Sequence, residues 1–240
     1  TVGSSNITFY AKWSKDTYYV AYDSQGGSSV LSSAYQIGDT VTLASGPTKV
    51  GYTFAGWATT VGGNSVGLTY APPGIGLVTL YAKWTAINYR VYYSSNNGNG
   101  GTVPSDTNNY NIGGTVTVVG NTSNVSRTGY TWSGWNTAAD GTGTTYQATG
   151  TFVMGSADVN LYAKWTPINY TITYDANGAT SGTAPVDSAN YNIGQNASVL
   201  GFNGLSRTGY SLWGWATTNN ATTAQYQIGR ASCRERVCQD

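Results

Sequence analysis

The pentapeptide Leu-Tyr-Ala-Lys-Trp occurs at residues 80–84 and again at residues 161–165, and a near copy, Phe-Tyr-Ala-Lys-Trp, occurs at residues 9–13. Apolar and polar residues alternate along each copy. Alternation with a period of two residues is typical of a strand that buries one face. A chain that contains the same strand three times predicts a repeated β unit in which this strand comes last.

The alternation also predicts which side chains of the closing strand are buried. Leu80, Ala82 and Trp84 fall on one face, and Tyr81 and Lys83 fall on the other. We expect the apolar set to be core and the lysine to be solvated.

Two further motifs recur in the same order before each closing strand. Tyr-x-Ile-Gly occurs at residues 35–38, 110–113 and 191–194, and Gly-Tyr-Ser/Thr-x-x-Gly-Trp begins at Gly51, Gly129 and Gly209. Successive tryptophans of the second motif are 78 and 80 residues apart, and Trp84 and Trp165 of the closing strand are 81 apart. A period near 80 residues exceeds that of solenoids and propellers, so each unit can close a small core of its own.

The motifs divide the chain into five segments. Residues 1–15 are the end of a preceding repeat, residues 16–85 and 86–166 are complete repeats, residues 167–228 are a truncated repeat, and residues 229–240 are foreign. We refer below to the first, second and third repeats.

The expectation for the last segment rests on a break in composition. Both cysteines, Cys233 and Cys238, and the only glutamate, Glu235, lie in it. Residues 228–237 resemble the translation of a sequencing adapter, and such segments are excluded from fold reasoning.

Composition favours a mainly β fold. Charged residues make up 9% of the chain, against about 25% in an ordinary globular protein, while Gly (32), Tyr (20) and Trp (8) are abundant. Aromatic residues suit strands, and glycine and asparagine suit tight turns. Strands are predicted over residues 88–93, 114–119, 130–135 and 170–174. No helical periodicity is sustained, and at most one short helix per repeat is expected, in the second repeat near residues 146–152.

The ordered set of three motifs, with the Tyr-x-Val/Ile-x-Tyr strand that precedes it, resembles the Listeria-Bacteroides repeat family over nearly all of residues 9–227. The resemblance implies compact β-grasp-like modules in tandem on bacterial surface or secreted proteins. The third repeat departs from the family pattern: Leu212 and Trp213 replace Phe54 and Ala55 of the first, and no closing strand follows.

The sequence argues against an enzyme. It contains no histidine and, outside the foreign segment, no cysteine, which excludes the commonest general base and thiolate sites. Asp23, Asp140 and Asp175 stand beside Gly, Ser or Asn and are expected to form turns rather than bind a metal. We therefore predict no catalytic, cofactor-binding or metal-binding residue.

The motif aromatics allow two interpretations. They are expected to be core and packing residues, because small domains without disulfides need large buried rings. The alternative is a stacking platform for sugars. The motif residues are Tyr52, Gly56, Trp57, Trp84, Tyr130, Gly134, Trp135, Trp165, Tyr210, Gly214 and Trp215.

The expected function is that of an adhesion stalk or spacer within an extracellular or cell-surface bacterial protein, with neighbouring repeats as partners. The alternatives are a module that binds a host or cell-wall glycan or a surface protein, and an accessory repeat of an exported enzyme. A formal charge of +1 gives no footprint for nucleic acid, and no apolar stretch is long enough to span a membrane.

Overall fold

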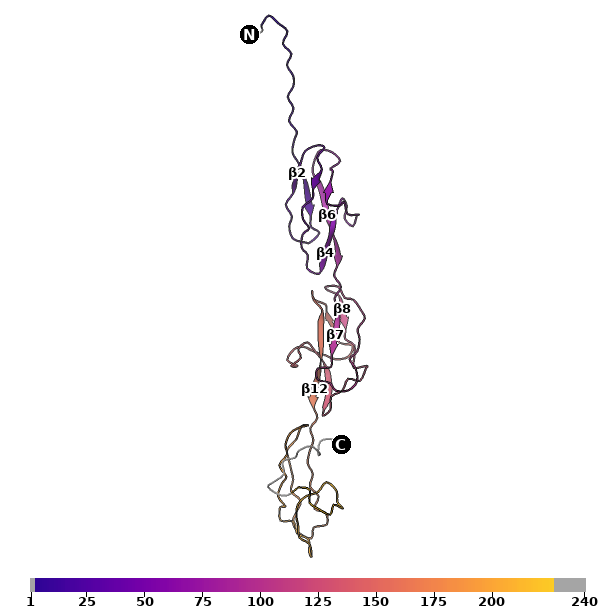
Figure 1. The fold of residues 1–240 in the computed structure, drawn as a ribbon, viewed down its shortest axis with the longest axis vertical. Helices are drawn as coiled ribbons and strands as arrows, with labels where there is room; N and C mark the ends of the chain where they lie inside the picture. The colour runs from indigo at the N-terminus through magenta and orange to yellow at the C-terminus, as the bar shows by residue number, and fades with distance from the viewer. Residues whose placement is uncertain (1–2, 227–240) are drawn as a thin grey trace. The chain divides into compact units, whose positions relative to one another are not determined.

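The computed structural model describes residues 3–226, and every regular element in this range is a β-strand (Figure 1). The predicted mainly β fold of repeated small modules is therefore confirmed. The short helix expected near residues 146–152 is not formed. Strands β10 (Thr145–Tyr146) and β11 (Thr151–Val153) lie there instead, separated by a turn in which Thr149 has a φ of 65°.

Five of the other strands lie close to predicted positions: β6 (Val78–Ala86), β7 (Val91–Ser94), β8 (Thr115–Thr117), β9 (Tyr130–Asn136) and β12 (Val159–Pro167). The remaining strands, for which no range was predicted, are β1 (Tyr18–Asp23), β2 (Ser33–Tyr35), β3 (Val41–Thr42), β4 (Tyr52–Ala58) and β5 (Thr69–Tyr70).

The described chain divides into two compact units. One contains residues 3–90, 107–116 and 151–159, and the other contains residues 91–106, 117–150 and 160–226. The second repeat thus contributes segments to both units.

The main sheet of the first unit has the order β2-β1-β6-β4. Strands β1 and β6 are parallel, with Val20 opposite Val78, whereas β4 and β6 are antiparallel, with Trp57 opposite Ala82. The closing strand β6 therefore lies in the interior of the sheet, with a partner on each side.

The main sheet of the second unit has the order β10-β9-β12-β7. Three of its strands, β7, β12 and β9, repeat the arrangement of β1, β6 and β4, whereas the fourth strand lies beside β9 and not beside the first strand. Its closing strand β12 is antiparallel to β9, with Ala163 opposite Trp135, and lies next to β7 on its other side. Two shorter pairs, β3 with β5 and β8 with β11, complete the sheets.

The cores gather around the closing strands. Leu80 and Leu161 are fully buried, and Ala82 and Ala163 are buried beside them, as the alternation predicted. Trp84 is only half-buried, because it packs on the edge of the core rather than inside it.

A bulge explains how two rings of β4 reach the same core. The register between β4 and β6 shifts between Phe54 and Gly56, so Ala55 is an extra residue in the strand. Phe54 and Trp57, three residues apart, consequently pack together with ring centroids 5.2 Å apart. Gly56 has a φ of 119°, and an added Cβ would meet the Ser65 side chain, so this position requires glycine.

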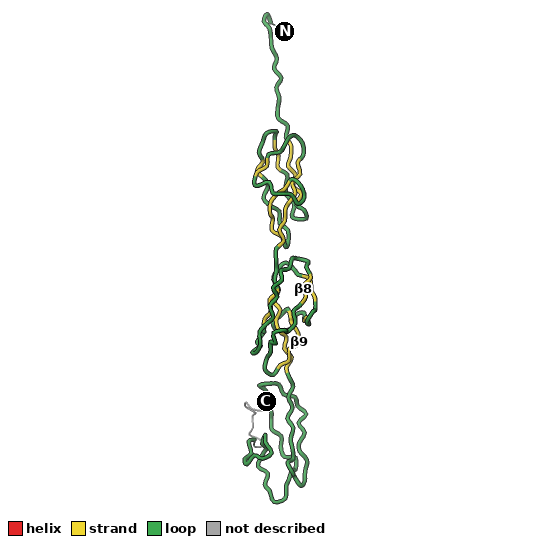
Figure 2. Tube along the Cα trace, turned by 90° about the vertical axis from the view of Figure 1, so that its right-hand side faces the viewer, coloured by secondary structure: helices red, strands yellow, loops and turns green. Residues whose placement is uncertain are grey.

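The described part of the third repeat contains isolated bridges and no strand, and Figure 2 draws it as loop. Tyr170 bridges Tyr191, and Trp215 bridges Tyr226. The strand predicted over residues 170–174 is therefore wrong. The physical reason is that alternation within a segment does not supply a partner: within residues 3–226 this segment pairs with no strand, and only the bridge from Tyr170 to Tyr191 forms.

Residues 9–13, expected to be a closing strand, form none, and Phe9 and Trp13 are 91% and 92% exposed. The segment expected to be foreign, residues 229–240, lies outside the described residues.

Replacing the buried leucine of the closing strand tests the position of the core. Leu161→Ala should lower the free energy of unfolding of the second repeat by about 2–5 kcal/mol, because it leaves a cavity beneath β12. Hydrogen exchange of β9 and β12 amides under increasing denaturant measures this loss. The control Val153→Ala, at a position 67% exposed, should change it by less than about 0.5 kcal/mol. Equal effects of the two substitutions would contradict the assignment.

Candidate functional site

Each repeat packs the tryptophan of its Gly-Tyr motif against a tyrosine of its first strand or strand equivalent. We call this pair the aromatic clamp. The ring centroids are 4.6 Å apart for Tyr22 and Trp57, 4.9 Å for Tyr93 and Trp135, and 4.8 Å for Tyr174 and Trp215.

The tyrosine hydroxyl of each clamp accepts a hydrogen bond from one backbone amide that follows the Tyr-x-Ile-Gly motif. The N–H to hydroxyl distances are 3.1 Å from Ala44 to Tyr22, 2.8 Å from Val119 to Tyr93, and 2.9 Å from Leu200 to Tyr174. Three segments that are distant in sequence thus meet at one peptide group in every repeat.

The indole nitrogens distinguish the second clamp from the other two. Trp57 Nε1–H donates to the Ala44 carbonyl at 2.9 Å, and Trp215 Nε1–H donates to the Leu200 carbonyl at 3.0 Å. Trp135 Nε1 is buried and has no partner among the described residues. A buried donor without an acceptor costs free energy, so the second clamp carries a local penalty.

The tryptophan of the closing strand holds the first turn of the repeat. Trp84 Nε1–H donates to the Ser24 carbonyl at 3.0 Å. Trp165 Nε1–H donates to the carbonyls of Ser95 and Asn96 at 3.1 and 2.8 Å. The last strand therefore fixes the loop that follows the first strand.

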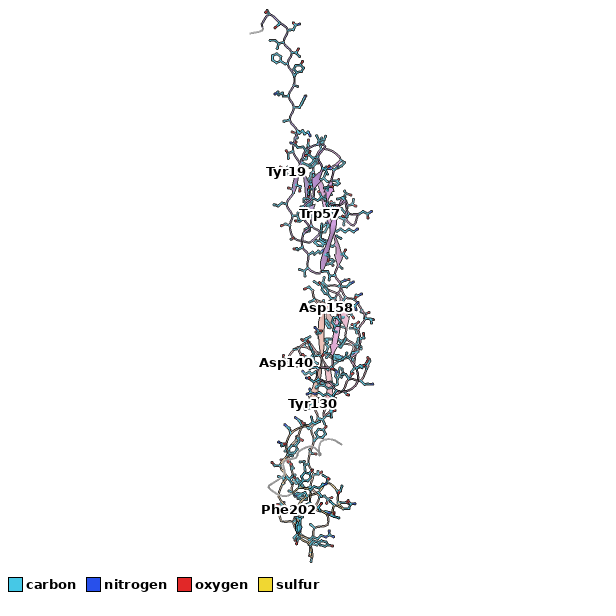
Figure 3. The ribbon with its side chains drawn as sticks, in the orientation of Figure 1. Tyr19, Trp57, Tyr130, Asp140, Asp158 and Phe202 are labelled. Carbon is cyan, nitrogen blue, oxygen red and sulfur yellow. The ribbon has the colours of Figure 1, made fainter. Side chains whose placement is uncertain are left out.

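The burial of the clamps decides what their rings can contact. Trp57 and Trp135 are 2% and 0% exposed, so neither ring can stack on a ligand in the folded repeat. Figure 3 labels Trp57 within the first repeat. Trp215 is half-buried.

The motif tyrosines stack against cations. The side chains of Lys49, Arg127 and Arg207 lie 4.7, 3.9 and 4.3 Å from the ring centroids of Tyr52, Tyr130 and Tyr210, in that order. These distances are within the range of cation–π attraction. Tyr52 and Tyr130 are half-buried and Tyr210 is 67% exposed.

The bulge recurs at Gly134, where the register between β9 and β12 also shifts. Gly134 has a φ of 124°, and Trp132 and Trp135 pack with ring centroids 5.8 Å apart, as Phe54 and Trp57 do. At Gly214 an added Cβ would meet the carbonyl oxygen of Tyr226.

The aspartates form turns, as predicted. Asp23, Asp140 and Asp175 accept hydrogen bonds from backbone N–H groups two residues later, at 2.9, 3.0 and 2.8 Å. The backbone N–H of Thr142, and then its hydroxyl, lower the pKa of Asp140 below its usual value. Figure 3 shows Asp140 in its loop.

Residues 3–226 contain no group of three or more acidic, histidine or cysteine residues that could hold a metal ion. None of these residues belongs to a helix long and apolar enough to cross a membrane.

A contact between a glycine and an isoleucine, which was not predicted from the sequence, recurs where one repeat meets the next. Gly51 is buried, and an added Cβ would lie 2.5 Å from Ile112 Cγ2. Gly129 is likewise buried, and its Cβ would lie 2.5 Å from Ile193 Cγ2. The glycine of one repeat's Gly-Tyr motif thus receives the isoleucine of the next repeat's Tyr-x-Ile-Gly motif. Both residues belong to recurrent motifs, but neither motif indicates that the two residues meet.

Backbone hydrogen bonds from the linkers accompany this contact. Ile87 N–H donates to the Gly51 carbonyl at 2.9 Å, and Ile168 N–H donates to the Gly129 carbonyl at 2.9 Å. We call the glycine, the isoleucine that covers it and the linker bond the joint.

The outermost copies of the same motif residues lack these contacts. Ile37 is 52% exposed, and no atom lies within 4 Å of a Cβ added at Gly209. The burial of glycine and isoleucine therefore depends on a neighbouring repeat.

The different indole environments predict different effects of the same substitution. Trp57→Phe removes a hydrogen bond to Ala44, whereas Trp135→Phe removes a buried donor that has no partner. The free energy of unfolding should therefore fall by about 1–2 kcal/mol more for Trp57→Phe. Hydrogen exchange of β4 and β6 amides in one variant, and of β9 and β12 amides in the other, measures both losses. A greater loss in Trp135→Phe would contradict the assigned environments.

Comparison with known proteins bears on these recurrent features. The profile of the Listeria-Bacteroides repeat domain matches residues 18–83, 89–164 and 170–234. No solved structure matches the chain.

Two proteins of Evansella cellulosilytica are similar to the chain. One, with the provisional name of a membrane protein, is 34% identical over 166 residues, which cover 69% of this chain and 25% of that protein. The other, with the provisional name of a Gly-rich membrane protein, is 34% identical over 146 residues, or 55% of this chain and 16% of that protein. The chain thus spans a quarter or less of these relatives.

The three matched segments cover most of the chain and coincide with the three recurrences of the clamp. The prediction made from the motifs is confirmed: the chain belongs to the Listeria-Bacteroides repeat domain family.

Proposed function

We propose that this chain is a non-catalytic part of a bacterial cell-surface or secreted protein, in which tandem repeats act as an adhesion stalk or spacer. Membership of a tandem-repeat family supports the proposal, as do the names of two relatives that refer to a membrane protein. Both relatives are much longer than the matched region, as is expected where repeats carry other domains.

The joint is the observation that carries the proposal. A spacer has to hold each repeat to the next, and the same glycine, isoleucine and linker bond occur at both repeat boundaries. Neighbouring repeats coupled through one recurrent contact are characteristic of extended repeat proteins, whose stability is a sum of repeat and interface terms.

Hydrogen bonds and a proline restrain the linkers between the repeats. In the first joint, Asn111 Nδ2 donates to the Ile87 carbonyl at 3.0 Å and to Asn88 Oδ1 at 2.9 Å, in addition to the bond from Ile87 N–H to Gly51. In the second, Pro167 precedes Ile168 and fixes one backbone angle. Flexible Gly/Ser linkers make no such bonds.

Ligand binding through exposed rings is the weaker candidate. Tyr19 and Tyr92 are each 49% exposed, but they occupy different positions of their repeats, because Val20 and Val91 are the equivalent residues. The complete repeats therefore share no exposed ring on the first strand. The clamp tryptophans that recur are buried, and the other recurrent rings, those of Tyr52 and Tyr130 and of Trp84 and Trp165, are half-buried.

Removing the isoleucine of one joint should loosen the boundary while both repeats stay folded. Spin labels at Val61→Cys and Val153→Cys, both on residues 67% exposed, report the distance across the first joint. Cys233→Ser and Cys238→Ser remove the other thiols. The distance distribution measured by pulsed electron paramagnetic resonance should be narrow in this parent and broad after Ile112→Ala.

The matched control is Ile37→Ala. This isoleucine has the same position in its motif but covers no glycine, so its replacement should leave the distribution narrow. A parent distribution as broad as that of Ile112→Ala would contradict the spacer proposal, because the joint would then impose no fixed arrangement.

A further inference from the structure

Asparagine followed directly by glycine occurs at Asn97, Asn99, Asn177 and Asn203. Glycine has no side chain to hinder the approach of its backbone nitrogen to the preceding side chain, so an asparagine in this pair loses its amide more readily than in other sequences. Asparagine is also among the residues that are chemically labile in proteins at high temperature. The surroundings of each asparagine in the folded protein therefore decide which of the four reacts.

Hydrogen bonds hold the side-chain amides of three of these asparagines. Asn99 is held at both ends, because its Nδ2 donates to Thr128 Oγ1 at 2.9 Å and its Oδ1 accepts from the Thr128 N–H at 3.1 Å. Asn177 and Asn203 each donate one hydrogen bond from Nδ2, at 3.3 and 3.1 Å. The side chain of Asn97 is exposed and makes no hydrogen bond within residues 3–226.

The two asparagines of the second repeat also differ in their backbone contacts. Asn99 lies in a backbone bridge, where its own N–H and that of the next residue both donate to the Ser126 carbonyl, at 2.9 and 3.2 Å. Asn97 lies in a turn, which is closed by one hydrogen bond from Gly98 N–H to the Ser95 carbonyl at 2.9 Å. Gly98 N is free to react when this single bond opens, so Asn97 is held less firmly in both its side chain and its backbone.

Asn97 occupies a position at which the other repeats have glycine. The residue four positions after the clamp tyrosine is Gly26 in the first repeat, Asn97 in the second and Gly178 in the third, with φ values of 83°, 67° and 77°. This left-handed conformation costs free energy for a residue that has a side chain. The turn thus accepts glycine here, and the asparagine distinguishes the second repeat from the other two.

We propose that Asn97 is a site of spontaneous deamidation, which marks the second repeat as the protein ages. The backbone nitrogen of Gly98 loses its proton and attacks Cγ of Asn97. A C–N bond forms, the bond from Cγ to Nδ2 breaks, and Nδ2 leaves as ammonia with the proton from Gly98. Water then opens the five-membered succinimide at one of its two carbonyls. The product is either aspartate or isoaspartate, in which the main chain runs through the side-chain methylene.

The reaction changes the turn that the closing strand holds. The carbonyls of Ser95 and Asn96 accept from Trp165 Nε1–H at 3.1 and 2.8 Å, and Asn96 Nδ2 donates to the Ala163 carbonyl at 2.9 Å. Isoaspartate adds one atom to the main chain at the next residue, and either product adds a negative charge there. Deamidation should therefore weaken the contact between Trp165 and the turn, a change that the spacer proposal does not include.

Asn97 and Asn99 provide a matched comparison within one peptide. The full chain is kept in mildly alkaline buffer, either folded or unfolded in urea, and samples are then cleaved after Arg90 and Arg127 to release residues 91–127. Mass spectrometry with fragmentation measures the acid formed at each asparagine. In the folded chain Asn97 should react several times faster than Asn99. In urea the two should react at similar rates, because the hydrogen bonds to Thr128 are lost.

Two substitutions test the reasons given for this difference. Thr128→Val removes the acceptor of Asn99 Nδ2, so it should speed the reaction at Asn99 and leave the rate at Asn97 unchanged. Asn97→Gly introduces the residue that the other repeats have in this turn. Ageing of the wild-type chain should speed hydrogen exchange of the Trp165 indole N–H, measured by nuclear magnetic resonance, whereas ageing of Asn97→Gly should not.

Equal rates at the two asparagines in the folded chain would overturn the proposal, as would a faster reaction at Asn99. The proposal would also fail if Asn97 stayed unchanged in the folded chain while it reacted in urea, because the turn would then protect it. An unchanged rate at Asn99 in Thr128→Val would contradict the protection assigned to its hydrogen bond. Equal exchange of the Trp165 indole in aged wild type and aged Asn97→Gly would contradict the structural consequence.

Discussion

The closing strand is the constraint on which each repeat depends. It is an interior strand of the sheet in both complete repeats, so its removal leaves two strands without a partner. Its leucine and alanine fill the core, and its tryptophan donates to the turn that follows the first strand. The described part of the third repeat retains the other motifs and a clamp and forms only isolated bridges. Local strand propensity is therefore insufficient to form a sheet in this segment.

Two kinds of contact build on that sheet. Within a repeat, the clamp brings the first strand, the Gly-Tyr motif and one peptide of the intervening segment together. Between repeats, the joint uses the glycine at the start of the Gly-Tyr motif and the isoleucine of the Tyr-x-Ile-Gly motif. The same short motifs thus contribute both to the core of each repeat and to the contact between repeats. The clamp tryptophans of the complete repeats, Trp57 and Trp135, are buried, so the proposed spacer role uses them for packing and not for binding.

Much of this architecture could be predicted from the sequence, because alternation and repeated motifs report local structure. The strands at Val91, Thr115 and Tyr130 and the burial of Leu80 followed from a period of two, and the aspartate turns followed from their neighbours. The bulge could not be predicted in this way, because one extra residue, Ala55, changes the register without changing the composition. The joint was not predicted, because Gly51 and Ile112 are far apart in sequence and a single glycine does not indicate which residue covers it. The strand expected at residues 170–174 failed because alternation describes a segment and not the partner that it needs. The β-grasp-like topology implied by the resemblance stays a prediction.

The role of the closing strand is tested most directly by amide exchange at three equivalent positions. Ala44, Val119 and Leu200 each donate their N–H to a clamp tyrosine, at similar distances. If a repeat is stable only with its interior strand, the Ala44 and Val119 amides should exchange through global unfolding of their repeats. The Leu200 amide should exchange orders of magnitude faster. Nuclear magnetic resonance of the full chain, at a concentration where it is a single chain, resolves all three. Equal protection of Leu200 would contradict the account, since the clamp alone would then suffice to hold a repeat together.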